Sequence, residues 1–370
     1  MFIVIGLAFL ALYLLIVFYI GWSGWTWIKP AVSHRFRLFY IIALVFLASS
    51  LILSRVIEGS AILSIIGSYW IAIFGLLAML LPLVHLMVWL TKLTKVPRHS
   101  VQKWSGIATL ILLIILLGYG SFNAFSPTVR SYDVNIDKKG PESGELHIVM
   151  ASDMHFGYLS GRGHAERMVE EINALKPDIV VLPGDIVDDD IFPFQDRGVG
   201  DILSKIEAPL GVFASLGNHD QYKGETEELI GLIEKSGIQV LYDETIEVGG
   251  WLTLVGRKDY SERERADLVS LTEEIDRSKP ILMLEHQPIE LDIAEEQGID
   301  LMVSGHTHKG QIAPGNLITS RLFENDWGQL QKGQLNSIVS SGYGFWGPPI
   351  RIGSRSEVTS IHVRFSNWKS

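Results

Sequence analysis

Five short polar clusters constrain the fold of this chain most strongly, because each one follows a short apolar run. The runs lie at 148–150, 179–182, 211–213, 281–284 and 301–303, and they are typical of buried strands. The clusters read Asp153-Met154-His155, Gly184-Asp185-Ile186-Val187-Asp188, Gly217-Asn218-His219-Asp220, Glu285-His286-Gln287-Pro288 and Gly305-His306-Thr307-His308. In α/β sheets, ligands gather at the carboxyl ends of strands. The sequence therefore predicts an α/β domain whose strands bring these side chains to one edge.

The side chains of the clusters indicate a metal site. They offer carboxylate, imidazole and amide donors, and the chain has no cysteine, which excludes thiolate ligands and disulfides. Asp153 and His155 are two residues apart, as are His306 and His308, so each pair points the same way from an extended segment. One such cluster is as typical of a turn as of a site, whereas five together predict a pair of divalent ions. These donors suit Mn²⁺, Fe or Zn²⁺ better than Ca²⁺.

The same clusters suggest a reaction. Two ions about 3.5–4 Å apart can share a carboxylate and a bridging hydroxide, which attacks phosphorus while the ions neutralise phosphoryl charge. The leaving oxygen then needs a proton. His219 is the candidate donor, and Asp188 is a carboxylate that can keep its imidazole charged and oriented.

The first 125 residues differ from the rest in hydropathy. Hydrophobic residues make up 48% of the 370-residue chain, and the excess lies before about residue 125. A membrane span needs roughly 20 apolar residues, and four apolar stretches approach or exceed that length, at about 2–20, 38–54, 61–90 and 105–122. The first lacks the basic start and the cleavage site of a signal peptide, so we expect a retained span.

Basic residues in the predicted loops give an expected orientation. The first loop carries Lys29, Arg35 and Arg37, and the third carries Lys92, Lys95, Arg98 and Lys103. The second has little beyond Arg55 and Glu58. The positive-inside rule places the first and third loops in the cytoplasm. The domain that follows the last span is then expected outside the cytoplasm.

The composition divides the chain into three segments. We expect a transmembrane helical domain at 1–125, a linker at 126–145 and a soluble α/β domain at 146–370. Helical periodicity at 164–175, 226–236 and 265–276, with strand-like runs near 252–256, 336–341 and 358–364, predicts helices layered on two sheets. The net charge of -10 belongs mostly to this half, so no nucleic-acid partner is expected.

The order D-x-H, G-D-x-x-D, G-N-H-D, H and G-H-T-H resembles the calcineurin-like metallophosphoesterases over about 146–365. That resemblance implies an α/β sandwich of two sheets flanked by helices, with two metal ions. The implied ligands of one ion are Asp153, His155, Asp185 and His308. Those of the other are the bridging Asp185, Asn218, His286 and His306. The implied catalytic pair is His219 with Asp188.

The late segment from Ser340 to Thr359 is similar to a bacterial, membrane-anchored subgroup of that family. The usual motifs of that subgroup are nearer S-R-G-x-G and G-H-T-H-G-G-Q. This chain has Ser341 in place of the arginine and Lys309 in place of a glycine. Every metal-ligand position is intact, so the departures concern the substrate pocket. Arg351, Lys309 and Trp346 are as consistent with packing or surface roles as with substrate contact.

The resemblance implies a hydrolase of phosphoesters or pyrophosphates, anchored in a bacterial cytoplasmic membrane and facing outward. The expected partners are membrane lipids and a phosphorylated small-molecule or lipid substrate, for example an envelope precursor. The alternative is a non-catalytic transporter or interaction protein with a structural metal site. The helices of a transporter would need ionisable residues along the path of its substrate, and the apolar stretches carry almost none. A metallopeptidase is disfavoured because the motif H-E-x-x-H is absent.

Overall fold

The computed structural model describes residues 2–57, 60–224 and 226–366, so Glu58 of the charge argument lies outside the described residues. The chain forms two compact units. The first comprises the residues up to Ser121 together with Gly347–Ile350, and the second comprises Phe122–Trp346 together with the residues from Arg351 onward.

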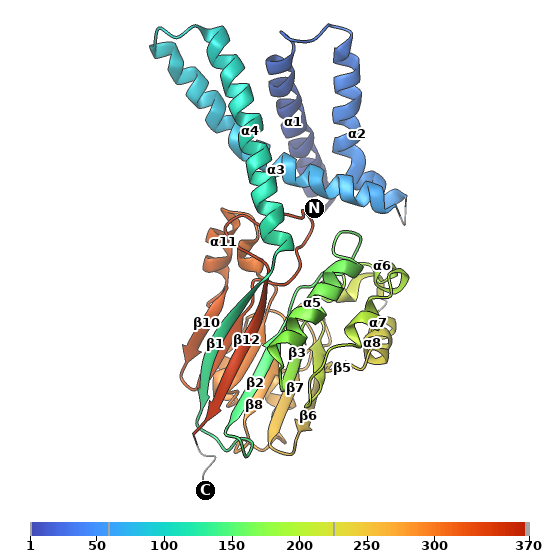
Figure 1. Cartoon of the computed structure of the whole chain (residues 1–370), viewed down its shortest axis with the longest axis vertical. Helices are drawn as coiled ribbons and strands as arrows, with labels where there is room; N and C mark the ends of the chain where they lie inside the picture. Colours follow the sequence, from blue (N-terminus) through green and yellow to red (C-terminus); the bar gives the residue numbers. More distant parts are fainter. Residues whose placement is uncertain (1, 58–59, 225, 367–370) are drawn as a thin grey trace. The chain divides into compact units, whose positions relative to one another are not determined.

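The N-terminal unit is helical (Figure 1). Its helices are α1 (Phe2–Ile28), α2 (Phe36–Val56), α3 (Ala61–Leu90), the 3₁₀ turn η1 (Thr91–Leu93) and α4 (Arg98–Phe125), which runs into the second unit. In the described residues, four helices are long and apolar enough to cross a membrane: Val4–Ile28, Phe36–Ser54, Ala61–Leu93 and Ser100–Phe125. Large apolar side chains such as Phe9 and Phe18 are about 70% exposed, as expected for surfaces that face lipid. The four predicted apolar helices are confirmed.

Two mixed six-stranded sheets form the second unit, within the described residues (Figure 1). In order across the first sheet lie β1 (Thr128–Ile136), β12 (Glu357–Phe365), β2 (Glu145–Met150), β3 (Ile179–Pro183), β4 (Val212–Ser215) and β5 (Gln239–Val240). The second sheet contains β10 (Gly328–Lys332), β11 (Leu335–Val339), β9 (Leu301–Ser304), β8 (Ile281–Leu284), β7 (Leu252–Gly256) and β6 (Glu244–Val248). The predicted two-sheet α/β fold is confirmed.

Apolar side chains hold the layers together. Ile148 and Met150 of the first sheet share a core with Leu282 and Leu284 of the second. Helices cover the outer faces and bury further apolar side chains there. These helices are α5 (Arg162–Leu175), α6 (Phe192–Asp196), α7 (Val199–Leu203), α8 (Thr226–Lys235), α9 (Leu268–Leu271) and α10 (Leu291–Glu296), while η2 (His219–Gly224), η3 (His308–Gly310) and α11 (Gly315–Leu322) follow strand ends.

The strands that precede the five clusters form as predicted. They are β2, β3, β4, β8 and β9, and each apolar run falls inside or at the start of its strand. β2, β3 and β4 are parallel neighbours, and β8 is parallel to β9. Their carboxyl ends therefore open onto the same edge of the sandwich.

Two segments differ from the expectation. Residues 126–145, expected as a linker, contain strand β1, which pairs in parallel with β12 because alternate side chains of 128–136 turn toward the core. The helix expected at 265–276 shrinks to α9 at Leu268–Leu271. Asp267 caps its start, and the helix ends at its C-cap Thr272, whose backbone leaves the helical region at φ -106° and ψ 3°.

Candidate metal centre

Two groups of donor atoms converge in the loops after the strand ends. Asp153, His155 and His308 form one, and Asp185, His286 and His306 form the other. A further group combines His155 with the predicted catalytic pair, Asp188 and His219, whose donor atoms also lie within 4.8 Å of one another. In each group, one donor atom from every member lies within 4.8 Å of the others. The structure therefore brings together six of the seven side chains that the sequence predicts as ligands, divided between two groups as the resemblance implies.

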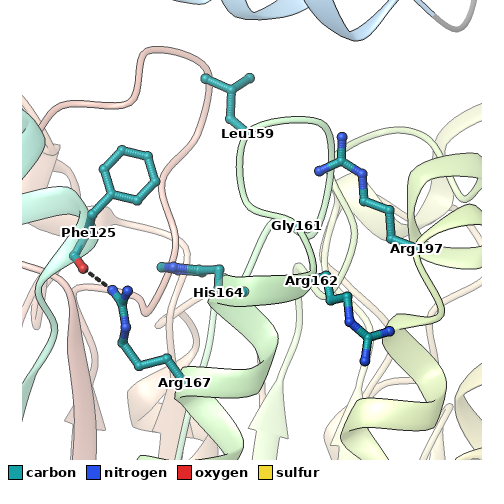
Figure 2. A pocket seen from close by; sticks show the side chains of 8 residues that line it. Phe125, Leu159, Gly161, Arg162, His164, Arg167 and Arg197 are labelled. Carbon is teal, nitrogen blue, oxygen red and sulfur yellow. Dashed lines mark hydrogen bonds between the residues drawn. The ribbon is translucent and has the colours of Figure 1, made fainter.

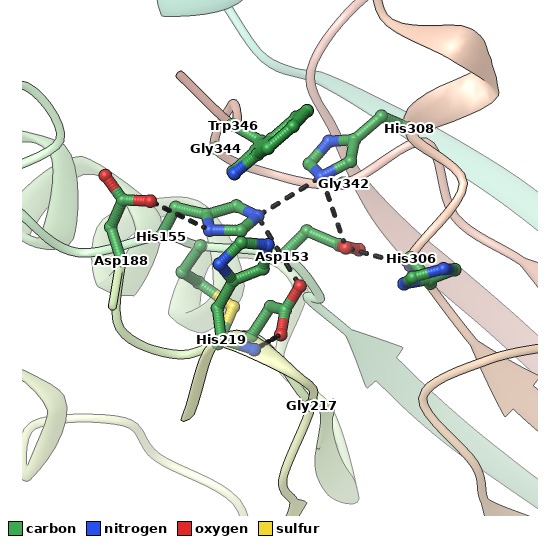
Figure 3. A network of polar contacts seen from close by, with 12 residues as sticks. Asp153, His155, Asp188, Gly217, His219, His306, His308, Gly342, Gly344 and Trp346 are labelled. Carbon is green, nitrogen blue, oxygen red and sulfur yellow. Dashed lines mark hydrogen bonds and ion pairs between the residues drawn. The ribbon is translucent and has the colours of Figure 1, made fainter. Parts of the chain in front are cut away.

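The first group is buried (Figure 3). His155 Nε2 lies 3.2 Å from His308 Nε2, and His308 Nε2 lies 3.5 Å from Asp153 Oδ1. Two imidazole nitrogens that face each other at this distance share at most one proton between them. These ring nitrogens and the carboxylate thus face a common space.

Asp185 connects the two groups. Its Oδ2 lies 3.1 Å from His286 Nε2 in the second group and 3.6 Å from His155 Nε2 in the first. Burial opposes ionisation of Asp185, but the charge of His286 lowers the pKa of this carboxyl well below its usual range. A carboxylate that contacts both groups has the placement that a bridging ligand requires.

The seventh predicted ligand, Asn218, presents a buried acceptor without a protein donor. Within the described residues, Asn218 Oδ1 and Asp153 Oδ2 are buried and have no hydrogen-bond partner. A buried unsatisfied acceptor costs about 1–3 kcal/mol, and a cation would remove that cost. The oxygen and nitrogen donors therefore fit divalent metal ions, and the site contains no soft sulfur ligand.

Backbone strain is concentrated at the same side chains. A positive φ is uncommon outside glycine and is associated with functional sites. Five of the seven predicted ligands have φ between 45° and 68°: Asp153, His155, Asp185, His306 and His308. Gly184, at φ 83°, lies so close to the His286 ring that an added Cβ would be 2.5 Å from Nδ1.

Two neighbours orient the donors. The buried Asp220 accepts from the backbone amides of Ile186 and Val187, both at 2.9 Å, and from that of Gly217 at 2.8 Å. This carboxylate ties the loop of Asp185 to the loop of Asn218. His286 Nδ1 lies 3.0 Å from the carbonyl oxygen of Pro183. A ring that donates there directs its Nε2 at the site.

The partner of His219 is not the one that the sequence predicted. His219 Nδ1 lies 2.5 Å from Asp189 Oδ1, whereas Asp188 Oδ1 lies 3.5 Å from His155 Nδ1. Burial opposes the charged ring, but the hydrogen bond to Asp189 and the charge of Asp185 raise the pKa of His219 to about 9. The difference arises in the run of three aspartates at 188–190, where Asp189 has φ 60° and sends its side chain toward His219.

Three residues that the sequence analysis weighed as substrate contacts lie outside the groups of donors. Arg351 is fully buried; its guanidinium donates to the carbonyl of Gly344 at 2.7 Å and to His308 Nδ1 at 3.1 Å, so it holds this loop and a predicted ligand in place. Lys309 Nζ lies 3.3 Å from the centre of the Trp327 ring. Trp346 is 54% exposed, and its ring centre is 5.8 Å from that of His219.

Sequence reasoning missed Asp189 and Asp220. Asp220 belongs to the motif G-N-H-D, so its place next to two predicted site residues was a usable signal. Asp189 had no comparable signal, because it lies between two other aspartates.

A two-sheet sandwich with carboxylate, imidazole and amide donors at its strand ends is the arrangement of a metallophosphoesterase. Comparison with known sequences agrees: the family "Calcineurin-like phosphoesterase" matches residues 146–310. A metallophosphoesterase of Helicobacter pylori strain J99 is 32% identical over 261 residues, which cover 68% of each chain. One of Aquifex aeolicus is 31% identical over 264 residues, which cover 69% of this chain and 98% of that protein. The chain belongs to the calcineurin-like metallophosphoesterase family.

A further relative shares the combination of this domain with membrane spans. The zebrafish "Transmembrane protein with metallophosphoesterase domain" is 32% identical over 275 residues, or 70% of this chain. The aligned part spans 62% of that protein's length. Among solved structures, the NAD nucleotidase of Haemophilus influenzae is similar at a TM-score of 0.35 and 15% identity, over 54% of this chain and 45% of that one.

Proposed function

We propose that this protein is a membrane-anchored hydrolase of phosphoesters or pyrophosphates that uses two divalent metal ions. The observation that carries the proposal is the position of Asp185, whose carboxylate contacts both groups of donors. Family membership supports the reaction class. A phosphorylated lipid or small molecule is the proposed substrate, because an enzyme anchored in a membrane shares one surface with a lipid substrate.

Each ion has a set of protein donors. Asp153, His155, Asp185 and His308 would hold one ion, and Asp185, Asn218, His286 and His306 would hold the other. Mn²⁺, Fe or Zn²⁺ suits these donors. When bound, such ions supply positive charge for the phosphoryl oxygens and lower the pKa of coordinated water.

The remaining chemistry belongs to His219. Asp189 holds its Nδ1, so the imidazole stays charged and keeps a proton on Nε2. From there the ring donates that proton to the oxygen that leaves phosphorus. The exposed Trp346 ring lies next to His219 and offers an apolar surface to the leaving group.

Removal and return of metal tests the proposal. The full-length protein in detergent is stripped with a chelator and assayed on an aryl phosphomonoester and a bis-aryl phosphodiester, before and after addition of Mn²⁺. We expect turnover to fall to background without metal and to return with it, and the preferred ester identifies the substrate class. Folded protein that binds no metal would contradict the proposal.

We also propose that the four apolar helices span the membrane and that the second unit, here called the catalytic unit, lies outside the cytoplasm. The lengths and hydropathies of the helices support the spans. The basic residues of the first and third loops support the orientation.

The absence of cysteine makes the orientation easy to test. Ser278→Cys places one thiol on an exposed turn of the catalytic unit, and Ser33→Cys places one in the first loop. In spheroplasts, we expect a membrane-impermeant maleimide to label the cysteine at position 278 at once and the one at position 33 only after lysis. The reverse pattern would place the catalytic unit in the cytoplasm.

A further inference from the structure

A cavity of the catalytic unit lies outside the metal centre, at the start of α5 (Figure 2). Its volume is about 450 Å³. Besides two glycines, its lining consists of Phe125, Leu159, Arg162, His164, Arg167 and Arg197. The described lining thus holds three guanidinium groups and no carboxylate, a composition that favours an anionic ligand.

The arginines keep donors available. A guanidinium carries five N–H donors, and among the described residues the hydrogen bonds and ion pairs of each arginine use one nitrogen. Arg197 Nη1 donates to the Tyr158 carbonyl at 3.1 Å, and Arg167 Nη1 donates to the Phe125 carbonyl. Arg162 Nε lies 2.9 Å from Glu166 Oε1, which offsets part of its charge. The charge of Arg167 interacts with the Glu171 carboxyl without an ion pair at close distance. Within the described residues, Arg167 and Arg197 form no ion pair and keep donors for an anion.

The N-terminus of α5 adds positive potential at the same place. The helix has 14 residues, and its N-cap, Gly161, provides no side chain to accept from the first amides. Such an end attracts anions through its amides and its dipole. An added Cβ at Gly161 would collide with Arg197 Nη1, so the glycine also permits the close approach of that guanidinium.

His164 points independently to a ligand. Its side chain projects from the first turn of α5 into the cavity, near Phe125 and Arg167 (Figure 2). The residue is 6% exposed, and within the described residues its Nε2 is buried without a hydrogen-bond partner. Burial lowers the pKa of His164 to about 4, while a hydrogen bond to the Tyr343 backbone opposes that shift. The ring is therefore neutral, and its Nε2 has its hydrogen-bonding capacity unused.

The apolar part of the lining connects the cavity with lipid. Phe125 is the last residue of the candidate span Ser100–Phe125. Chain connectivity therefore keeps this wall at the end of a membrane-crossing helix, where phospholipid headgroups lie. Phe125 and Leu159 offer contact to the apolar part of a lipid, and the arginines offer contact to its phosphate.

We propose that this cavity binds the headgroup of an anionic phospholipid, through a phosphate that adjoins a hydroxyl group. Arg167 and Arg197 bind the phosphate oxygens, the first turn of α5 assists them, and His164 Nε2 accepts from the hydroxyl. The site does not use the metal centre and does not depend on the proposed reaction. It ties the catalytic unit to the membrane surface beside the last span.

Native mass spectrometry of the full-length protein in detergent tests the site. Four probes are titrated: dioleoyl phosphatidylglycerol, phosphatidylethanol (the same charge without a headgroup hydroxyl), phosphatidylcholine and inorganic phosphate. We expect phosphatidylglycerol to bind most tightly, phosphatidylethanol several-fold more weakly and phosphatidylcholine most weakly. Millimolar inorganic phosphate that displaces phosphatidylglycerol supports a phosphate subsite, whereas binding of inorganic phosphate alone overturns the lipid assignment.

Variants locate the binding. The double variant Arg167→Gln, Arg197→Gln is expected to lower the affinity for phosphatidylglycerol by about tenfold or more. Gly161→Ala should also lower this affinity, because it displaces Arg197 while keeping every charge. Arg263→Gln, an exposed arginine outside the lining, is the matched control. His164→Phe is expected to make phosphatidylglycerol and phosphatidylethanol bind equally. Wild-type affinity in both the double variant and Gly161→Ala, or no preference of the wild type for phosphatidylglycerol over phosphatidylcholine, overturns the proposal.

Discussion

Asp185→Asn is expected to lower turnover of phosphoesters by about 10³-fold or more. Asp185 Oδ2 contacts His286 and His155, one from each group of donors. An amide keeps the shape of the side chain but loses the charge that a bridge between two cations needs. Metal ions supply several kcal/mol of transition-state stabilisation, and each 1.36 kcal/mol corresponds to about tenfold in rate.

The metal content separates this effect from misfolding. After gel filtration in Mn²⁺, we expect elemental analysis to find two ions per wild-type chain and at most one in Asp185→Asn. Asp201→Asn is the matched control, because Asp201 is an exposed carboxylate in the first turn of α7. A variant with two bound ions and full activity would show that Asp185 is not the bridge.

Asp189→Asn is expected to slow the enzyme by about 10²–10³-fold on esters with poor leaving groups, within the range of general acid catalysis. Asp189 holds His219 Nδ1 at 2.5 Å, and without its charge the imidazole loses the proton that the leaving oxygen needs. On aryl esters, whose leaving groups depart without a proton, the loss should be small. The measurement is the dependence of kcat on the leaving-group pKa.

Asp188→Asn provides the comparison, because the two aspartates are neighbours in sequence and have different partners. Asp188 contacts His155 and is 34% exposed. Its replacement should affect metal affinity more than the leaving-group dependence. If Asp188→Asn steepened that dependence and Asp189→Asn did not, the pairing expected from the sequence would be correct and the structural assignment wrong.

The sequence specified much of the site because strand ends fix where the site side chains gather. The apolar run at 148–150 places Asp153 and His155 after a strand, and the run at 301–303 does the same for His306 and His308. The expectation of an extended segment was wrong for both pairs, because all four residues have φ between 45° and 68°, and His306 and His308 lie in different groups of donors. The division of the ligands between two groups came from the resemblance to a family and not from the spacing.

The partner of His219 could not be predicted in the same way. Three successive aspartates offer the same chemistry, and the sequence does not distinguish Asp189, at φ 60°, as the one that contacts His219 Nδ1. The cavity at α5 also depends on tertiary structure, since Arg197 is far along the chain from Arg162 and Arg167. Strand β1 was missed because its side chains are half-exposed in alternation and its partner lies near the other end of the domain.

The first sheet of the catalytic unit can be completed only after β12 has been synthesised. β12 lies between β1 and β2, and Arg130 of β1 pairs with Glu357 of β12 although 227 residues separate them. Synthesis of that interval takes roughly 10–45 s at about 5–20 residues per second. Throughout that time β1 presents an unpaired edge that is open to mispairing. The first sheet therefore closes late, and a nascent chain stalled before β12 should be a substrate for chaperones that protect exposed strands.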